Sequence, residues 1–263
     1  MITTLAIIFF VLGIIIGSFL NVVIFRYNTH RSFGGRSGCM VCQKELSWYE
    51  LFPIFSFIFL KGRCRGCKTR ISKQYPLVEF ITGIIFALLF LKFQDVFFFD
   101  TVGFSIAYTY YATIFSLLIV IAVYDLKHKI IPDVLALVLG ILSFIGLFFY
   151  VNFSFYPHFP TILEFLAGPL IALPFALMWF ISKGKWMGLG DAKLAISFGW
   201  LLGIYFALSA LVLAFWSGAI LGLLLIIFSK KYGIKSEIPF APFLVLGVIL
   251  SFLFSLQFFP MIF

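Results

Sequence analysis

Long hydrophobic runs separated by short polar segments fill almost the whole chain. A run of about 17 or more apolar residues can cross the roughly 30 Å hydrocarbon layer of a membrane as a helix, which satisfies its own backbone hydrogen bonds there. The pattern therefore predicts an all-α, polytopic membrane protein. The first run, at residues 5–25, has no basic segment before it and no small-residue cleavage site after it. We interpret it as a permanent span rather than a removable signal peptide.

The later runs predict seven further spans. Residues 194–229 carry no charge and are too long for one span, so we expect two short helices there with a turn near residues 207–210. Pro169 and Pro174 interrupt another run, but bundled membrane helices tolerate proline. The total is about eight transmembrane helices, with both chain ends on the outer side. The remaining spans are expected at residues 77–91, 104–124, 134–151, 162–181 and 238–263.

The composition and the placement of charge agree with this layout. Hydrophobic residues make up 63% of the chain and charged residues 11%, which excludes a water-soluble globular domain. Ten of the 19 Lys and Arg residues lie between residues 26 and 73, and the predicted layout leaves only Lys92 on the outer face. By the positive-inside rule the loop at 26–76 is cytoplasmic, in a multi-pass protein of the cytoplasmic (inner) membrane. The net charge of +9 is thus explained by topology, with the lipid bilayer rather than nucleic acid as the partner.

Two C-x-x-C pairs lie in this loop, separated by 21 residues. Each pair can offer two thiolates to one tetrahedral ion, so the four cysteines predict a closed, structural zinc site. Disulfides are the alternative, but a reducing cytosol disfavours them. The expected ligands are Cys39, Cys42, Cys64 and Cys67.

Two aspartates lie at the predicted inner boundary of the membrane. Asp125 ends an uncharged run, and Asp191 follows Gly188 and Gly190 in a Gly-x-Gly-Asp segment that begins another span. Ionisable groups at membrane depth are costly, so they indicate function by default. Two close carboxylates share one proton, and the ionised member can activate water for peptide hydrolysis. A helix cap or an interfacial charge is the alternative reading, and it suits Asp133, which follows Pro132.

Several segments, in order, resemble the bacterial prepilin peptidases, also called type IV leader peptidases. The resemblance covers nearly the whole chain and its combination of motifs is specific. The matching segments are residues 17–24 (GSFLNVVI), the two cysteine pairs, 62–65 (GRCR), 71–72 (IS), 75–79 (YPLVE), 125–133 (DLKHKIIPD), 187–194 (MGLGDAKL) and 238–240 (IPF).

The resemblance implies a bifunctional enzyme. Asp125 and Asp191 would be the catalytic pair of an aspartic endopeptidase that removes the short basic leader from prepilin or pseudopilin precursors at the cytoplasmic face. Gly188, Gly190, Asp133 and Lys193 lie in the same motifs and would support that pair. The cysteine loop is associated with N-methylation of the new N-terminus by S-adenosylmethionine. Residues 1–92 would then form the methyltransferase region and residues 93–263 a six-span peptidase domain.

One departure and two alternatives stay open at this stage. The segment at residues 49–53 is less polar than the family pattern, which bears on methylation. A broader Gly-x-Gly-Asp intramembrane protease would share both aspartates but would have no reason for a zinc loop. A transporter or a passive assembly factor would tolerate the loss of either aspartate. The sequence leaves open the precursor that is cut and the oligomeric state.

Overall fold

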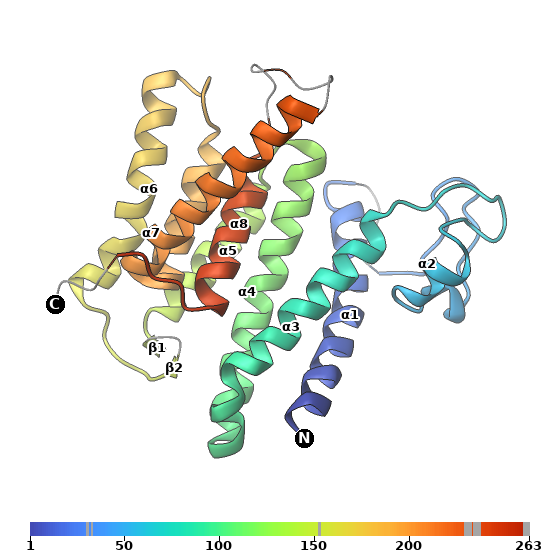
Figure 1. Cartoon of the computed structure of the whole chain (residues 1–263), viewed down its shortest axis with the longest axis horizontal. Helices are drawn as coiled ribbons and strands as arrows, with labels where there is room; N and C mark the ends of the chain where they lie inside the picture. Colours follow the sequence, from blue (N-terminus) through green and yellow to red (C-terminus); the bar gives the residue numbers. More distant parts are fainter. Residues whose placement is uncertain (30–31, 33, 152–153, 229–232, 234–237, 260–263) are drawn as a thin grey trace. The chain divides into compact units, whose positions relative to one another are not determined.

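The computed structural model describes residues 1–29, 32, 34–151, 154–228, 233 and 238–259. His30, Lys230, Lys231 and Lys235, together with the end of the last predicted span at 260–263, lie outside the described residues. The expectation of an all-α protein is confirmed (Figure 1), with one two-residue antiparallel hairpin besides the helices. The elements are α1 (Ile2–Arg26), η1 (Trp48–Leu51), α2 (Phe55–Phe59), α3 (Gln74–Phe99), α4 (Thr101–His128), α5 (Asp133–Gly146), β1 (Tyr150–Val151), β2 (Ser154–Phe155), α6 (Ile162–Ser182), α7 (Leu189–Phe228) and α8 (Ala241–Leu253).

Five of these helices, α1, α3, α4, α6 and α7, are long and apolar enough to cross a membrane. The helices α5 and α8 are apolar but shorter, with 14 and 13 residues. The 40-residue α7 is interrupted at Gly203, which has φ 73° and ψ 168°. Counting its two halves separately, and leaving aside the five-residue α2, gives eight apolar helical segments in the described chain. That α5 and α8 each cross the membrane stays a prediction.

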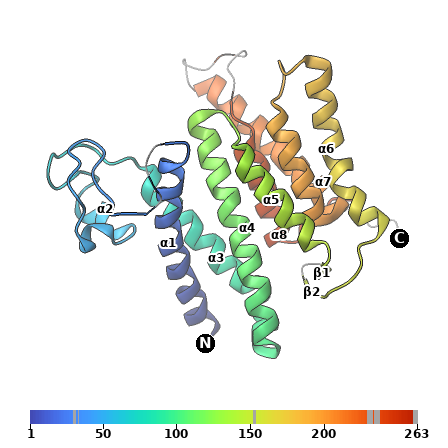
Figure 2. The same cartoon turned by 180° about the vertical axis from the view of Figure 1, so that it is seen from behind.

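Several predicted boundaries were wrong. The break in the long uncharged run lies at Gly203, whereas residues 207–210 continue the helix, because a positive φ costs little only where there is no Cβ atom. The connection left between the spans expected at 77–91 and 104–124 is mostly helical, and the chain turns tightly at Asp100, whose Oδ1 accepts hydrogen bonds from the N–H groups of Val102 and Gly103. The span expected at 134–151 ends as a helix at Gly146, before the hairpin that Figure 2 shows after α5.

The chain divides into two compact units, Met1–Phe104 and Ser105–Phe263. In the first unit α1 packs along α3, and two glycines allow the backbones to approach. A Cβ atom on Gly13 would lie 2.7 Å from the carbonyl oxygen of Thr82, and one on Gly17 would lie 2.8 Å from the Cα atom of Glu79. The absence of a side chain at both positions is therefore what sets the contact between these helices.

In the second unit α7 packs against α6 and α8. A Cβ atom on Gly199 would lie 2.4 Å from the carbonyl oxygen of Ala167, which places α6 in backbone contact with α7. Pro169 has no N–H, so the carbonyl of Phe165 loses its helical partner. The indole N–H of Trp200 on α7 donates to that carbonyl at 3.0 Å. The expected tolerance of proline in this helix thus has a specific structural cause.

Candidate functional site

Asp125 lies in the last turn of α4, and its residue is only 5% exposed. The backbone N–H of Ala241, the first residue of α8, interacts with its carboxylate. An unpaired N–H at a helix start is a natural partner for a carboxylate. The start of α8 therefore lies beside the Asp125 side chain, a neighbour that the sequence analysis did not predict for it.

Asp191 lies in the first turn of α7 and is 8% exposed. The loop before it begins at Lys183, which caps α6 in the left-handed conformation, and continues through Gly184 at φ +78°. Gly190 packs tightly, because a Cβ atom there would lie 2.9 Å from the Cβ atom of Ile131. Among the described residues, a Cβ atom on Gly188 would meet only the backbone nitrogen of Gly190, at 3.9 Å. The two glycines of the Gly-x-Gly-Asp segment thus differ in packing, although both border the cavity described next.

The two aspartates line one cavity of about 480 Å³ within the second unit. The charge of Asp125 acts on Asp191, so the two carboxyl groups lie within electrostatic reach of each other. Apolar walls surround them, and two lysines stand at the same cavity. The pair that the sequence predicted is therefore brought together, and the arrangement suits two carboxyl groups that share a proton. The other lining residues are Lys129, Ile130, Ile131, Gly184, Lys185, Trp186, Met187, Gly188, Gly190, Ile238, Pro239 and Phe240.

Asp133 and Lys193 form an ion pair instead of lining this cavity. The Lys193 Nζ atom lies 2.6 Å from Asp133 Oδ1, and it joins the start of α5 to the first turns of α7. The reading of Asp133 as a helix cap was wrong, since Pro132 is the N-cap of α5 and no side chain caps that end. The two residues join α5 to α7, and neither is among the residues that line the cavity.

The four cysteines in the first unit form one cluster, with all four Sγ atoms within 4.8 Å of one another. The Cys39 and Cys67 sulfurs are 3.7 Å apart, and those of Cys42 and Cys64 are 4.0 Å apart. Tetrahedral zinc with Zn–S bonds of about 2.3 Å requires sulfur–sulfur separations of about 3.8 Å. The residues present therefore fit a structural zinc ion, as the sequence predicted.

The two halves of this cluster have the same backbone design. The N–H of Cys39 donates to the carbonyl of Lys44, and the N–H of Cys64 donates to the carbonyl of Thr69, in both cases five residues later. A β-bridge joins Gly38 to Glu45, and another joins Arg63 to Arg70. Each half is thus a tight knuckle that presents two sulfurs on one side.

The pKa values of the cysteine thiols also favour the binding of a cation. Hydrogen bonds from the side chain and the backbone of Thr69 lower the pKa of Cys67 to about 6. The N–H of Lys44 acts to lower the pKa of Cys42, but desolvation and hydrogen bonds with the other cysteines raise it to about 11. One sulfur thus readily becomes a thiolate while its neighbour holds a proton, as expected for crowded like charges that a divalent cation would neutralise.

Comparison with known proteins gives consistent matches over most of the chain. Residues 11–93 match the Bacterial Peptidase A24 N-terminal domain, and residues 112–223 match the Type IV leader peptidase family. No solved structure matches the chain significantly.

Several relatives carry the name prepilin leader peptidase/N-methyltransferase, and three of them show the extent of the match. The protein of Bacillus subtilis is 32% identical over 250 residues, which cover 94% of this chain and 94% of the relative. The protein of Aeromonas salmonicida is 30% identical, covering 90% of this chain and 87% of the relative. The protein of Myxococcus xanthus is 33% identical over 88% of this chain, which spans 66% of that relative's length. With both domain matches in order along the sequence, this chain belongs to the type IV leader peptidase family.

Proposed function

We propose that this protein is a membrane aspartic endopeptidase that removes the short leader from type IV prepilin-like precursors and then methylates the new N-terminus. The observation that carries the peptidase activity is the pairing of Asp125 and Asp191. They lie 66 positions apart in the sequence, and both are buried at one cavity. The family match and the names of the relatives support both activities.

The aspartate pair can hydrolyse a peptide bond without a covalent intermediate. The ionised carboxylate takes a proton from water, and the water oxygen attacks the scissile carbonyl carbon. The protonated carboxyl group gives its proton to the carbonyl oxygen. When the C–N bond breaks, the leaving nitrogen is protonated and the other product is a carboxylic acid. Ile130, Ile131 and Phe240 supply apolar walls at this cavity, which suit the hydrophobic segment that follows the leader.

The proposed location is the inner membrane, with the catalytic residues at its cytoplasmic face and both termini outside. Most Lys and Arg residues lie in the cysteine loop and in the segments next to the two aspartates. Short basic segments stay on the cytoplasmic side. The leaders of the precursors would meet the enzyme on that side.

We assign the methylation to residues 1–92, which contain the cysteine cluster, and the cleavage to residues 93–263, which contain both aspartates. Zinc bound by Cys39, Cys42, Cys64 and Cys67 would fix the fold of the loop. S-adenosylmethionine, when bound, supplies a methyl group to the new amine and leaves as S-adenosylhomocysteine, while the amine loses a proton to water.

The experiment that tests the peptidase is co-expression with a candidate prepilin, followed by mass spectrometry of the prepilin N-terminus. Asp125→Asn and Asp191→Asn should each reduce cleavage by about 10³-fold or more, because either change removes the shared-proton pair. Asp95→Asn is the matched control, since Asp95 is an exposed carboxylate on α3. Both inactive variants should reach the membrane at the normal level. Near-normal cleavage by either one would refute the aspartate mechanism.

A further inference from the structure

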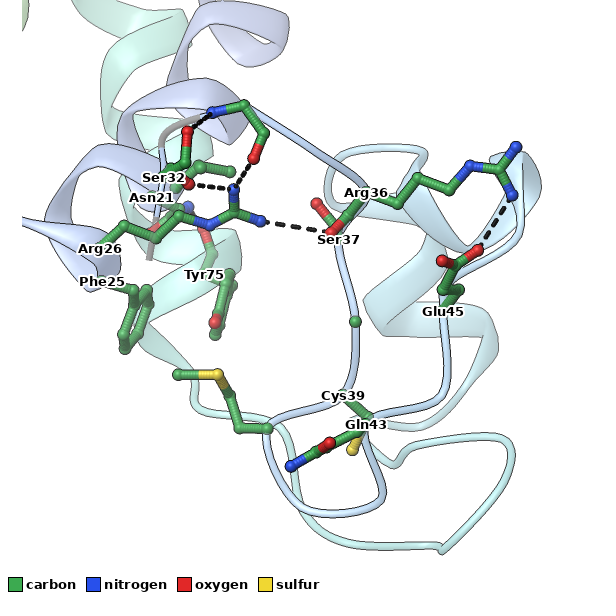
Figure 3. Close-up of a pocket in the computed structure, with 14 residues that line it drawn as sticks. Asn21, Phe25, Arg26, Ser32, Arg36, Ser37, Cys39, Gln43, Glu45 and Tyr75 are labelled. Atoms are coloured by element: carbon green, nitrogen blue, oxygen red, sulfur yellow. Dashed lines mark hydrogen bonds and ion pairs between the residues drawn. The ribbon is translucent and has the colours of Figure 1, made fainter. Parts of the chain in front are cut away.

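A cleft in the first unit lies between the helices α1 and α3 and the cysteine knuckles. It consists of two adjoining cavities of about 440 Å³ and 360 Å³, and Figure 3 shows the first of them. Each volume lies in the range of small-molecule sites. The two cavities share the lining residues Val22, Phe25, Ser37, Gly38, Cys39, Met40 and Tyr75.

Two buried carboxylates line the second cavity. Glu79 and Glu50 are 6% and 8% exposed. Glu79 Oε2 accepts a hydrogen bond from the N–H of Ile54 at 2.7 Å, and Glu50 Oε2 accepts one from the N–H of Ser47 at 2.8 Å. Neither forms an ion pair with a Lys or Arg side chain in the described part of the chain, whereas the exposed Glu45 pairs with Arg36.

The second cavity carries both signs of charge, because Arg65 and Arg70 line it together with Glu50 and Glu79. A buried charge is costly unless an opposite charge compensates it. Because the chain's own cations do not pair with Glu50 and Glu79 among the described residues, the cavity suits a ligand that carries a positive charge.

The wall shared with the first cavity offers different chemistry. The rings of Phe25 and Tyr75 stack with centroids 4.7 Å apart, and both line the two cavities. Asn21 is 1% exposed, and its Nδ2 donates to the carbonyl of Tyr75 at 3.1 Å. Its Oδ1 atom has no hydrogen-bond partner among the described residues. The cleft therefore combines flat aromatic surface, a spare amide acceptor, two buried carboxyl groups and arginine side chains, which suits a small ligand that carries charges of both signs.

A single arginine holds the rim of the first cavity in place. Arg26 donates from Nη1 to the carbonyls of Ser32 and Gly34, each at 2.7 Å, and from Nη2 to the carbonyl of Arg36 at 3.3 Å, as Figure 3 shows. Its guanidinium thus fastens the end of α1 to the segment that leads into the first knuckle. The zinc site and this cleft are parts of one local structure, because Cys39 and Cys64 also line the second cavity.

We infer that this cleft is the binding site for S-adenosylmethionine, an inference that rests on the proposed methyltransferase function. Glu79 and Glu50 would face the end of the molecule that carries the cationic sulfonium. Phe25 and Tyr75 would contact the adenosine. A site that offers both carboxyl groups and aromatic rings suits S-adenosylmethionine, which carries a cation, better than a simple nucleoside, which carries none.

The test uses three ligands that share the adenosine but differ in charge. S-adenosylmethionine carries a sulfonium, sinefungin carries an amine in its place, and S-adenosylhomocysteine carries neither. Binding to the full-length, detergent-solubilised protein is measured by isothermal titration calorimetry. Glu79→Gln should weaken S-adenosylmethionine and sinefungin by about tenfold, or ~1.4 kcal/mol, and S-adenosylhomocysteine by less than about twofold. Glu50→Gln tests the second carboxylate, with the same pattern expected.

Phe25→Ala provides the complementary variant, since it should weaken all three ligands alike. Asp95→Asn removes another carboxylate from α3 and should leave all three affinities unchanged. Zinc content and thermal unfolding of each variant report whether the first unit, which holds the cleft and the cysteine cluster, is folded. If the two Gln variants are folded and bind the three ligands as the wild type does, or weaken them all equally, the assignment of this cleft is wrong. If wild-type enzyme leaves its cleaved product unmethylated, the proposed methyltransferase function itself fails.

Discussion

At the scale of single residues, four ionisable side chains of the predicted site motifs divide into two groups. Asp125 and Asp191 are buried at one cavity, whereas Asp133 and Lys193 form an ion pair with side chains 75% and 41% exposed. Exposed ion pairs contribute little to stability because water screens them. All four residues belong to the two motifs at 125–133 and 187–194. In the structure the two buried aspartates line the cavity, whereas the exposed pair joins α5 to α7.

The exposed pair should therefore matter only modestly. We expect Asp133→Asn and Lys193→Met to reduce cleavage by less than about tenfold each, and a double-mutant cycle on stability to give a coupling of about 0.2–1 kcal/mol. Thermal unfolding of the single and double variants measures the coupling. Loss of cleavage as complete as in Asp125→Asn would show that one of these residues acts in the chemistry.

The cysteine cluster leads to a prediction about metal content and product. Wild-type protein should contain about one zinc ion per chain, and Cys64→Ser should lower this content because three thiolates hold zinc less tightly. Cys64 is the buried member of the set, so its loss also disturbs the wall of the adjoining cleft. Metal analysis and mass spectrometry of the prepilin should show a product that is cleaved but not methylated. A fully methylated product would exclude a role of the zinc loop in methylation.

At the scale of whole elements, close helix contacts depend on glycines that look alike in the sequence. Gly13 and Gly17 form one spaced pair, and Gly218 and Gly222 form another. A Cβ atom on Gly17 would meet the backbone of Glu79 at 2.8 Å, whereas one on Gly222 would meet, among the described residues, only a methyl group of Ile238 at 3.9 Å. The first pair sets the packing of α1 on α3, and the second pair has room within the part of the chain that the structure describes.

Substitution by alanine should distinguish the two positions. Alanine favours a helix over glycine by about 1 kcal/mol, so Gly222→Ala should be neutral or slightly stabilising. Gly17→Ala should instead destabilise by about 1–3 kcal/mol, because the added methyl group forces the helices apart. Thermal unfolding in detergent compares the two variants. Equal effects at both positions would contradict the contact described between α1 and α3.

The hydrophobic pattern predicted the long helices well and their ends poorly. Membrane hydropathy identifies α1, α3, α4 and α6, since each is one apolar run bounded by polar residues. It does not show where α5 ends, because the apolar run continues beyond the helix into β1. Nor does it locate the break in α7, which depends on the backbone of Gly203.

The same limits apply to the candidate sites. The two aspartates stand out because charge is rare near membrane helices, and the cysteines because their spacing is specific. Glu50 does not stand out, since an acid in a basic loop looks like solvated surface. Glu79 lies just inside the span expected at 77–91, and the sequence offered no separate reason to assign it a role. Only the fold shows that both are buried beside a cavity.

At the scale of the whole molecule, the residues for the two proposed activities lie in different compact units. The four cysteines, Glu50 and Glu79 belong to Met1–Phe104, and Asp125 and Asp191 belong to Ser105–Phe263. This division fits an enzyme whose two reactions can be impaired separately.

The proposed topology can be tested with reporters in two exposed segments. A reporter inserted after Lys61 should behave as cytoplasmic, and one after Pro157, between β2 and α6, as external. The reason is the concentration of Lys and Arg in the first segment. Alkaline phosphatase and green fluorescent protein fusions give opposite signals on the two sides. An external reading at residue 61 would place both aspartates on the wrong face for a cytoplasmic leader.

The hydrogen bond from Trp200 to the carbonyl of Phe165 makes two distant positions dependent on each other. The indole is needed only because Pro169 leaves that carbonyl without a helical partner, and lipid offers no water to replace it. Among descendants of this gene, loss of the tryptophan should therefore be tolerated mainly where the proline has already been replaced. The two positions are expected to covary, although each alone would look like an ordinary residue of a membrane helix.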